Sequence, residues 1–130
     1  MAEPTEPMPE SEEWRDVPGY DGGYQVSNLG RVRSIERITF DRHGREVPVP
    51  GRMLQQVIPP TTGQPEVSLS RRRASVNWRV RRLVALAFLG DPPHERAYVA
   101  NVSGDRLDNR ACNLEWRLKR REREALGIGK

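Results

Sequence analysis

The sequence is poor in cysteine, in histidine and in long apolar runs. Its single cysteine, Cys112, excludes an internal disulfide and a cysteine-rich zinc site. No apolar run approaches the roughly 20 residues that a helix needs to cross a bilayer. The acidic, polar N-terminal segment is not typical of a secretory signal. We therefore expect a cytoplasmic protein with no membrane partner.

Charge, by contrast, is abundant and unevenly distributed. The 130 residues carry a net charge of +4, and 22 of them are Lys or Arg. Residues 1–13 hold five glutamates and no base, which leaves 22 bases against 13 acids, or a net charge of +9, in the rest of the chain. Twenty of the bases are arginine, whose planar guanidinium binds phosphate in bidentate fashion. The composition predicts a disordered acidic tail over 1–13 and a small basic body that binds a polyanion, most often nucleic acid.

The segment after this tail reads as a small antiparallel β unit. Two short stretches of alternating apolar and polar residues, 24–27 and 31–35, flank a turn that ends in glycine. Because side chains alternate across a strand, Arg31 and Arg33 are expected on one face and Val32 on the other. One face of this unit is therefore predicted to be basic.

The middle of the chain predicts further short strands. Candidate strands are residues 53–58, 67–69 and 74–78, and candidate hairpin turns are residues 41–44 and 61–64. The prolines scattered through this region confine the strands to edges or short runs. An uninterrupted run of three arginines, Arg71 to Arg73, lies in the connection between the last two strands.

The clearest helix is expected over residues 80–89. Its apolar residues recur at three- and four-residue intervals and therefore form one face; they are Val80, Leu83, Val84, Ala87 and Phe88. A glycine and two prolines end this helix. A strand over 98–102 and a charged helix over 117–126 are expected beyond it.

Several of these motifs resemble those of the HNH homing endonucleases, which phages and mobile elements commonly carry. The stretches that carry the resemblance read WRDVPGY at 14–20, YQVSNLGRVRS at 24–34, VRRLVALAF at 80–88, VANVSGDRLDNR at 99–110 and NLEW at 113–116. The resemblance implies an α+β fold, with a small β-rich DNA-binding module over 14–40. An HNH-like ββα-metal unit, preceded by a helix, is implied over 41–126. It also implies a location in the host bacterial cell if the protein is phage-encoded.

The family's chemistry rests on a histidine that acts as general base and on one divalent metal that stabilises the leaving oxygen. At the base position this sequence has Asn101, whose amide accepts no proton near neutral pH, and the adjacent ligand position is Ala100. The last ligand position aligns with Glu122, and the family's Val-His-Arg reads Val-Arg-Arg at 80–82. The supporting Asn113 remains. The two histidines of the chain, His43 and His94, match no motif position.

These substitutions favour a DNA-binding protein on an HNH scaffold with a disabled nuclease centre, a pseudoenzyme that needs no cofactor. The arginines expected to contact double-stranded DNA are Arg31, Arg33, Arg71, Arg72, Arg73, Arg79, Arg81 and Arg82. A second interpretation is an active endonuclease or nickase with rearranged ligands, in which Asp105, Asp108 and Glu122 would bind Mg²⁺ or Mn²⁺. A third is an adaptor or inhibitor that reuses the fold to bind a protein partner.

Overall fold

A three-stranded antiparallel sheet opens the structure, a computed structural model that describes residues 11–125. Its strands are β1 (Trp14–Asp16), β2 (Tyr24–Ser27) and β3 (Val32–Ser34), in that order. Val26 and Val32 pair across the sheet and are fully buried, which confirms the expected inward face. The turn between them needs a glycine, because Gly30 has φ +90° and a Cβ there would meet the Asn109 backbone oxygen at 3.2 Å.

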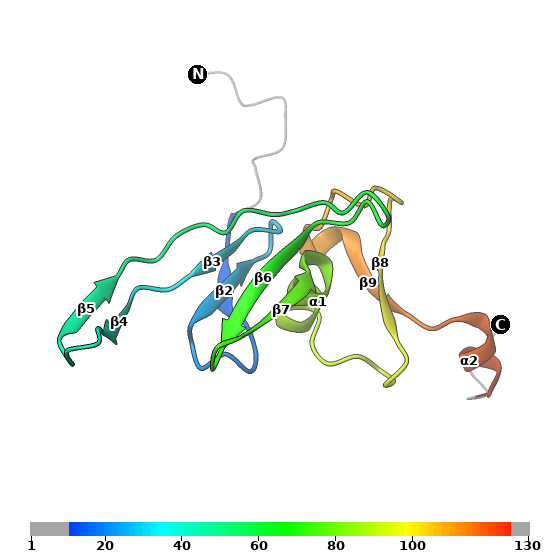
Figure 1. The fold of residues 1–130 in the computed structure, drawn as a ribbon. Coiled ribbons are helices and arrows are strands. Elements are labelled where there is room, and N and C mark those ends of the chain that lie inside the picture. Colours follow the sequence, from blue (N-terminus) through cyan, green and yellow to red (C-terminus); the bar gives the residue numbers. More distant parts are fainter. Residues whose placement is uncertain (1–10, 126–130) are drawn as a thin grey trace, which may run out of the picture.

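The strands β4 (Arg37–Phe40) and β5 (Glu46–Val49) form a hairpin that projects from one end of the molecule (Figure 1). The predicted turn at 41–44 is confirmed as its tip. The carboxylate of Asp41 accepts hydrogen bonds from the backbone N–H groups of His43 and Arg45, at 2.8 and 3.0 Å. These bonds, together with that to the Arg45 side chain, lower the pKa of Asp41. Nearly every side chain of the two strands is exposed.

A second hairpin lies against the first sheet and leads into the main helix. It joins β6 (Glu66–Arg71) to β7 (Ala74–Arg79), so the strands expected at 67–69 and 74–78 are confirmed and are longer than predicted. Its two-residue turn places Arg72 and Arg73 at φ +50° and +67°, the left-handed region that primed hairpin turns require.

The strand expected over 53–58 is wrong. This segment makes only two isolated bridges, Met53 to Arg33 and Val57 to Glu66. Because it crosses from the first sheet to the second hairpin, its two ends pair with different strands and no continuous ladder forms. The predicted turn at 61–64 closes the loop between the bridged residues Val57 and Glu66.

The helix α1 (Val80–Phe88) provides the centre of the fold. Val80, Leu83 and Val84 are fully buried, as the periodicity predicts, and Ala85 is buried beside them. The helix ends at a C-cap residue, Leu89, followed by a glycine at positive φ.

The chain then forms a third hairpin and a short terminal helix. β8 (Tyr98–Asn101) pairs with β9 (Leu114–Arg117), and the short 3₁₀ helix η1 (Ala111–Asn113) precedes β9. The charged helix α2 (Arg120–Ala125) begins three residues later than predicted, because residue 117 still pairs with Tyr98. Residue 126, its predicted last residue, lies outside the described residues.

One apolar core joins these elements, and the α+β class is confirmed. The core residues are Val17, Val26, Val32, Val67, Leu69, Val80, Leu83, Val84, Ala85, Val99 and Leu114. They come from both sides of the boundary predicted between residues 40 and 41, which stays a prediction. Within residues 11–125, no helix is long and apolar enough to cross a bilayer.

Candidate nucleic-acid interface and nuclease centre

The first sheet presents an ordered basic face, as the alternation of β3 predicts. The guanidinium of Arg33 lies 3.9 Å from the centre of the Trp14 ring, and that of Arg31 lies 5.6 Å from it. Arg33 also donates two hydrogen bonds to Gln25 Oε1, at 3.0 and 2.7 Å. Stacking and hydrogen bonding hold this guanidinium in place before any ligand arrives, which reduces the entropy cost of binding.

An acidic residue of the predicted tail contacts this basic face. Glu12 forms an ion pair with Arg31 and accepts two hydrogen bonds from its guanidinium. The hydrogen bond to Arg31 lowers the pKa of Glu12, and the same contact raises the pKa of Arg31. Residues 1–10 of that tail lie outside the described residues. A DNA phosphate at Arg31 would have to displace Glu12.

The tip of the second hairpin carries the run of three arginines. Arg71 donates to the backbone oxygen of Gly19 at 2.7 Å and lies 3.7 Å from the Asp21 carboxylate, so it connects the hairpin to the first sheet. Arg72 and Arg73, in the turn, are exposed. Two further bonds hold the hairpin against the first sheet, since Trp78 donates to the Tyr20 hydroxyl and the Ser70 N–H donates to the Tyr24 hydroxyl, at 2.8 and 3.0 Å.

Buried amides form the centre of the third hairpin. The side chain of Asn101 donates to the backbone oxygen of Asp108 and to Asn109 Oδ1, both at 2.9 Å. Asn113 donates to Ser103 Oγ and to the same Asp108 oxygen, and its Oδ1 accepts from the Ser103 N–H at 3.0 Å. Asn101 therefore serves here as a structural crosslink of the loop between β8 and η1.

Replacing Asn113 by alanine is expected to destabilise the fold by about 1–3 kcal/mol, because three hydrogen bonds inside a closed loop lose their partner. Urea denaturation of both chains measures the difference in the free energy of unfolding. Cys112→Ala, a change at an exposed neighbour, is the control and is expected to alter it by less than about 0.5 kcal/mol. An Asn113→Ala chain as stable as this control would contradict the crosslinking role.

A guanidinium lies directly against the base position. Arg81, in the first turn of α1, donates to Asn101 Oδ1 through Nη1 at 3.1 Å. Burial, followed by the charges of Arg79 and Arg106, lowers the pKa of Arg81. The neighbouring Arg82 points elsewhere, with its guanidinium 5.7 Å from the Trp116 ring centre. Both polar ends of the Asn101 amide are thus engaged by protein groups.

The three candidate carboxylate ligands do not form one site. Asp105 accepts from the Leu107 N–H at 2.9 Å and shapes the loop. Asp108 accepts two bonds from the Arg110 guanidinium, both at 2.8 Å, and these bonds lower its pKa. Glu122 Oε1 lies 3.7 Å from Arg96. Glu122 Oε2 is buried without a hydrogen-bond partner and is one candidate donor to a cation.

The residues present do not fit the divalent metal of an HNH centre. Within residues 11–125, no group of three His, Cys, Asp or Glu side chains comes together to hold an ion. Ala100 has no donor atom, and a positive guanidinium contacts Asn101. Neither histidine takes the place of the missing base at position 101. The hydrogen bonds of both lie elsewhere, since His43 accepts from Arg42 and His94 accepts from the Arg96 N–H.

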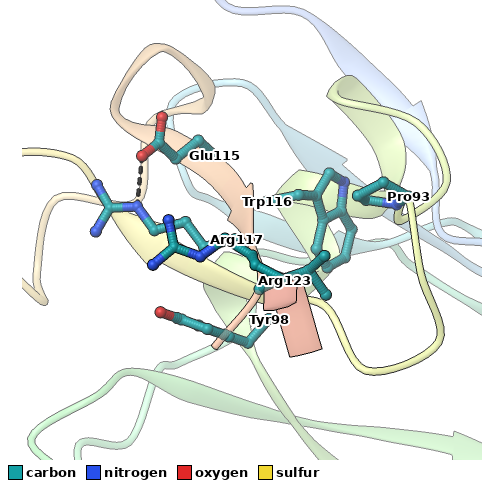
Figure 2. Close-up of a pocket in the computed structure, with 7 residues that line it drawn as sticks. Pro93, Tyr98, Glu115, Trp116, Arg117 and Arg123 are labelled. Atoms are coloured by element: carbon teal, nitrogen blue, oxygen red, sulfur yellow. Dashed lines mark hydrogen bonds and ion pairs between the residues drawn. The ribbon is translucent and has the colours of Figure 1, made fainter. Parts of the chain in front are cut away.

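An open pocket of about 570 Å³ lies between the third hairpin and α2 (Figure 2). Figure 2 shows Arg117 bonded to Glu115 and the Arg123 side chain between Arg117 and Tyr98. The full lining is Pro93, Tyr98, Glu115, Trp116, Arg117, Leu118 and Arg123. None of these residues was predicted as a site residue from the sequence, and none of the predicted site residues lines this pocket.

Two contributors to the basic surfaces were missed from the sequence. Trp14 belongs to the WRDVPGY motif, and an aromatic residue paired across the sheet with alternating arginines is a signal for stacking. No local sequence pattern marks Arg106 as part of a basic surface, because its bond to the Thr62 backbone oxygen joins residues 44 positions apart.

The chain has the fold of an HNH endonuclease. The sequence model of the NUMOD4 motif matches residues 12–70, which precede the third hairpin. In sequence the chain is 33% identical over 104 residues to DNA endonuclease I-HmuI of Bacillus phage SP01, covering 80% of this chain and 51% of the phage protein. It is 30% identical over 109 residues to an HNH endonuclease of Acanthamoeba polyphaga mimivirus, covering 82% of this chain and 24% of that protein.

The comparison of structures identifies the same phage relative as the comparison of sequences. The solved structure describing DNA binding and cleavage by the HNH homing endonuclease I-HmuI matches with a TM-score of 0.65 and 30% identity, covering 91% of this chain and 61% of that chain. The chain is therefore homologous to the phage homing endonuclease I-HmuI and to the mimivirus HNH endonuclease, which confirms the resemblance that its motifs predict. It spans about half of the curated phage relative and about a quarter of the mimivirus one.

Proposed function

We propose that this chain binds double-stranded DNA on an HNH endonuclease scaffold and cleaves it very slowly or not at all. The proposal rests on the residue at position 101, which is an asparagine where the family pattern has its histidine base. The neutral amide there has no lone pair basic enough to take a proton from water, and its oxygen already accepts from Arg81. Loss of a general base alone commonly slows a reaction by about 10²–10⁴-fold.

The DNA-binding half of the proposal rests on homology and on the basic faces. The structural relative I-HmuI binds DNA, and this chain presents the ordered pair Arg31 and Arg33 on its first sheet. Charge pairing with phosphates is largely independent of sequence, so it survives the loss of catalytic groups.

The proposal predicts tight duplex binding that weakens steeply with salt, together with a marked effect of the sheet arginines. Arg31→Ala combined with Arg33→Ala is expected to lower affinity by about tenfold or more. The slope of log K against log salt is expected to become less steep by about 0.9 for each phosphate that the variant no longer neutralises. Fluorescence anisotropy on a labelled duplex over a range of salt concentrations measures both quantities.

The matched control removes the same charge elsewhere. Arg45→Ala combined with Arg120→Ala deletes two arginines that are paired with carboxylates four residues away along the chain. Their loss is expected to change affinity far less than loss of the sheet pair. Equal losses in the two double variants would mean that only net charge matters, which argues against a defined interface.

A plasmid-nicking assay in Mg²⁺ and in Mn²⁺ tests the proposal that the chain cleaves DNA very slowly or not at all. We expect no metal-dependent nicking above that of a chain carrying Asn101→Ala. Turnover by the unaltered chain that this variant abolishes would instead favour an active nickase with rearranged ligands.

A further inference from the structure

Three arginines converge on the former nuclease centre from different parts of the chain. Arg79 is the last residue of β7, Arg81 lies in the first turn of α1, and Arg106 lies in the loop between β8 and η1. The Thr62 oxygen that holds Arg106 lies three residues before Pro65, whose oxygen accepts from the Val80 N–H at 3.0 Å. The loop that carries Arg106 therefore meets the end of β7 and the start of α1, where Arg79 and Arg81 lie. The charges of Arg79 and Arg106 also act on Arg81. Arg81 is anchored on Asn101, and Arg106 on the Thr62 backbone oxygen at 2.8 Å.

Among the described residues these three guanidiniums lack an ion-pair partner, although Glu66 lies opposite Arg79 across the β6–β7 ladder. Within residues 11–125, no carboxylate forms an ion pair with any of the three, whereas other arginines, such as Arg31, Arg45 and Arg110, are paired. The first turn of α1 also lacks an acidic residue, so the partial positive charge of the helix N-terminus adds to the cluster. A half-buried arginine beside two like charges is unfavourable in isolation, and an anion removes the penalty.

The cluster offers hydrogen-bond donors of the right kind. A guanidinium has five N–H donors in a planar fork, and the bonds to Asn101 and Thr62 each use only one nitrogen of their arginine. Donors therefore remain on Arg81 and Arg106, in addition to those of the exposed Arg79. Planar forks of this type match the oxygens of a phosphate.

We propose that Arg79, Arg81 and Arg106 form a phosphate-binding site that holds a backbone phosphate of DNA without a divalent ion. The inference rests on the proposed function and deepens it. A fixed guanidinium replaces the cation of the metal-dependent relatives. The same positive charge opposes binding of Mg²⁺ beside Asn101.

The test measures duplex binding by anisotropy with EDTA present and with Mg²⁺ present. We expect the same affinity in both buffers. Arg81→Gln is expected to weaken binding by about tenfold and to reduce the salt slope by about 0.9. Arg120→Ala, which removes one charge from α2, is expected to change both far less.

A second measurement uses inorganic phosphate as the probe. Anions that bind only the folded state raise the midpoint of thermal unfolding. Phosphate is expected to raise it for the unaltered chain more than for Arg81→Gln. Chloride at equal ionic strength is the control. Should Arg81→Gln fail to fold, Arg106→Gln, at an exposed side chain, is expected to show the same loss of DNA affinity and of phosphate stabilisation.

The outcomes separate this inference from the proposed function. The site is refuted, while DNA binding stands, if the unaltered chain binds duplex tightly but Arg81→Gln and Arg106→Gln behave like Arg120→Ala. It is also refuted if EDTA abolishes binding. If the unaltered chain does not bind duplex DNA in either buffer, the proposed function and this inference fail together.

Discussion

A chain that carries Ala100→Asn, Asn101→His and Arg81→His together is expected to nick supercoiled DNA in Mg²⁺ at least about 10²-fold faster than the unaltered chain. The histidine at 101 supplies the general base and the asparagine at 100 a ligand oxygen, as the family pattern places them. Removing the guanidinium takes away the positive charge beside the position where the family pattern places its metal.

Restoring the motif residues at 100 and 101 is not expected to be enough for cleavage, because Arg81 also has to be replaced. With Arg81 retained, the double change at 100 and 101 is expected to yield little cleavage. The guanidinium would lower the pKa of a histidine at 101, which weakens it as a base, and would repel a divalent ion as well. The nicking rates of the double and triple variants measure the effect of this one side chain.

The matched control for the triple variant carries Ala100→Asn, Asn101→Ala and Arg81→His. It has the same ligand and the same loss of positive charge but no histidine at the base position, so it is expected to stay inactive. Full activity in the double variant would refute the inhibitory role of Arg81. Activity in the control would refute the assignment of position 101.

Elements with a strong local pattern could be predicted from the sequence. The apolar periodicity of α1 identified its buried face, and the alternation of β2 and β3 identified the basic one. The hairpin turn at 41–44 was predicted, but the bounds of β4 and β5 were not, because a hairpin with nearly every side chain exposed carries no alternating apolar signal. The segment 53–58 was misread, because its apolar residues serve two different partners and only the tertiary structure shows which.

The candidate site shows the same difference between features encoded locally and features made by distant residues. The substitutions at Ala100 and Asn101 follow from motif alignment, since each motif is contiguous. The contact between Arg81 and Asn101 joins residues 20 apart, and that between Arg106 and Thr62 joins residues 44 apart. No local pattern encodes such pairs, so the guanidinium cluster is visible only in three dimensions.

Replacing Leu83 by alanine is expected to cost about 2–5 kcal/mol of folding free energy, a large part of the stability of a domain of this size. Leu83 is fully buried in α1, which contacts β1, β2, β7, β8 and β9. A cavity there weakens packing on both sides of the predicted boundary between residues 40 and 41. Urea denaturation followed by tryptophan fluorescence measures the loss of stability.

The control makes the same chemical change at the surface. Leu107 is 61% exposed, so Leu107→Ala is expected to change the free energy of unfolding by less than about 0.5 kcal/mol.

The number of unfolding transitions shows whether the chain folds as one unit or as two. Of the three tryptophans, Trp14 lies in the first sheet and Trp116 in the third hairpin, so chains that lack Trp78 and retain only one of these two report on each part separately. Because both parts share α1 as their core, the two probes are expected to show one coincident transition, and Leu83→Ala is expected to shift both equally. Separate midpoints would instead establish two independently folding modules that meet near residue 40.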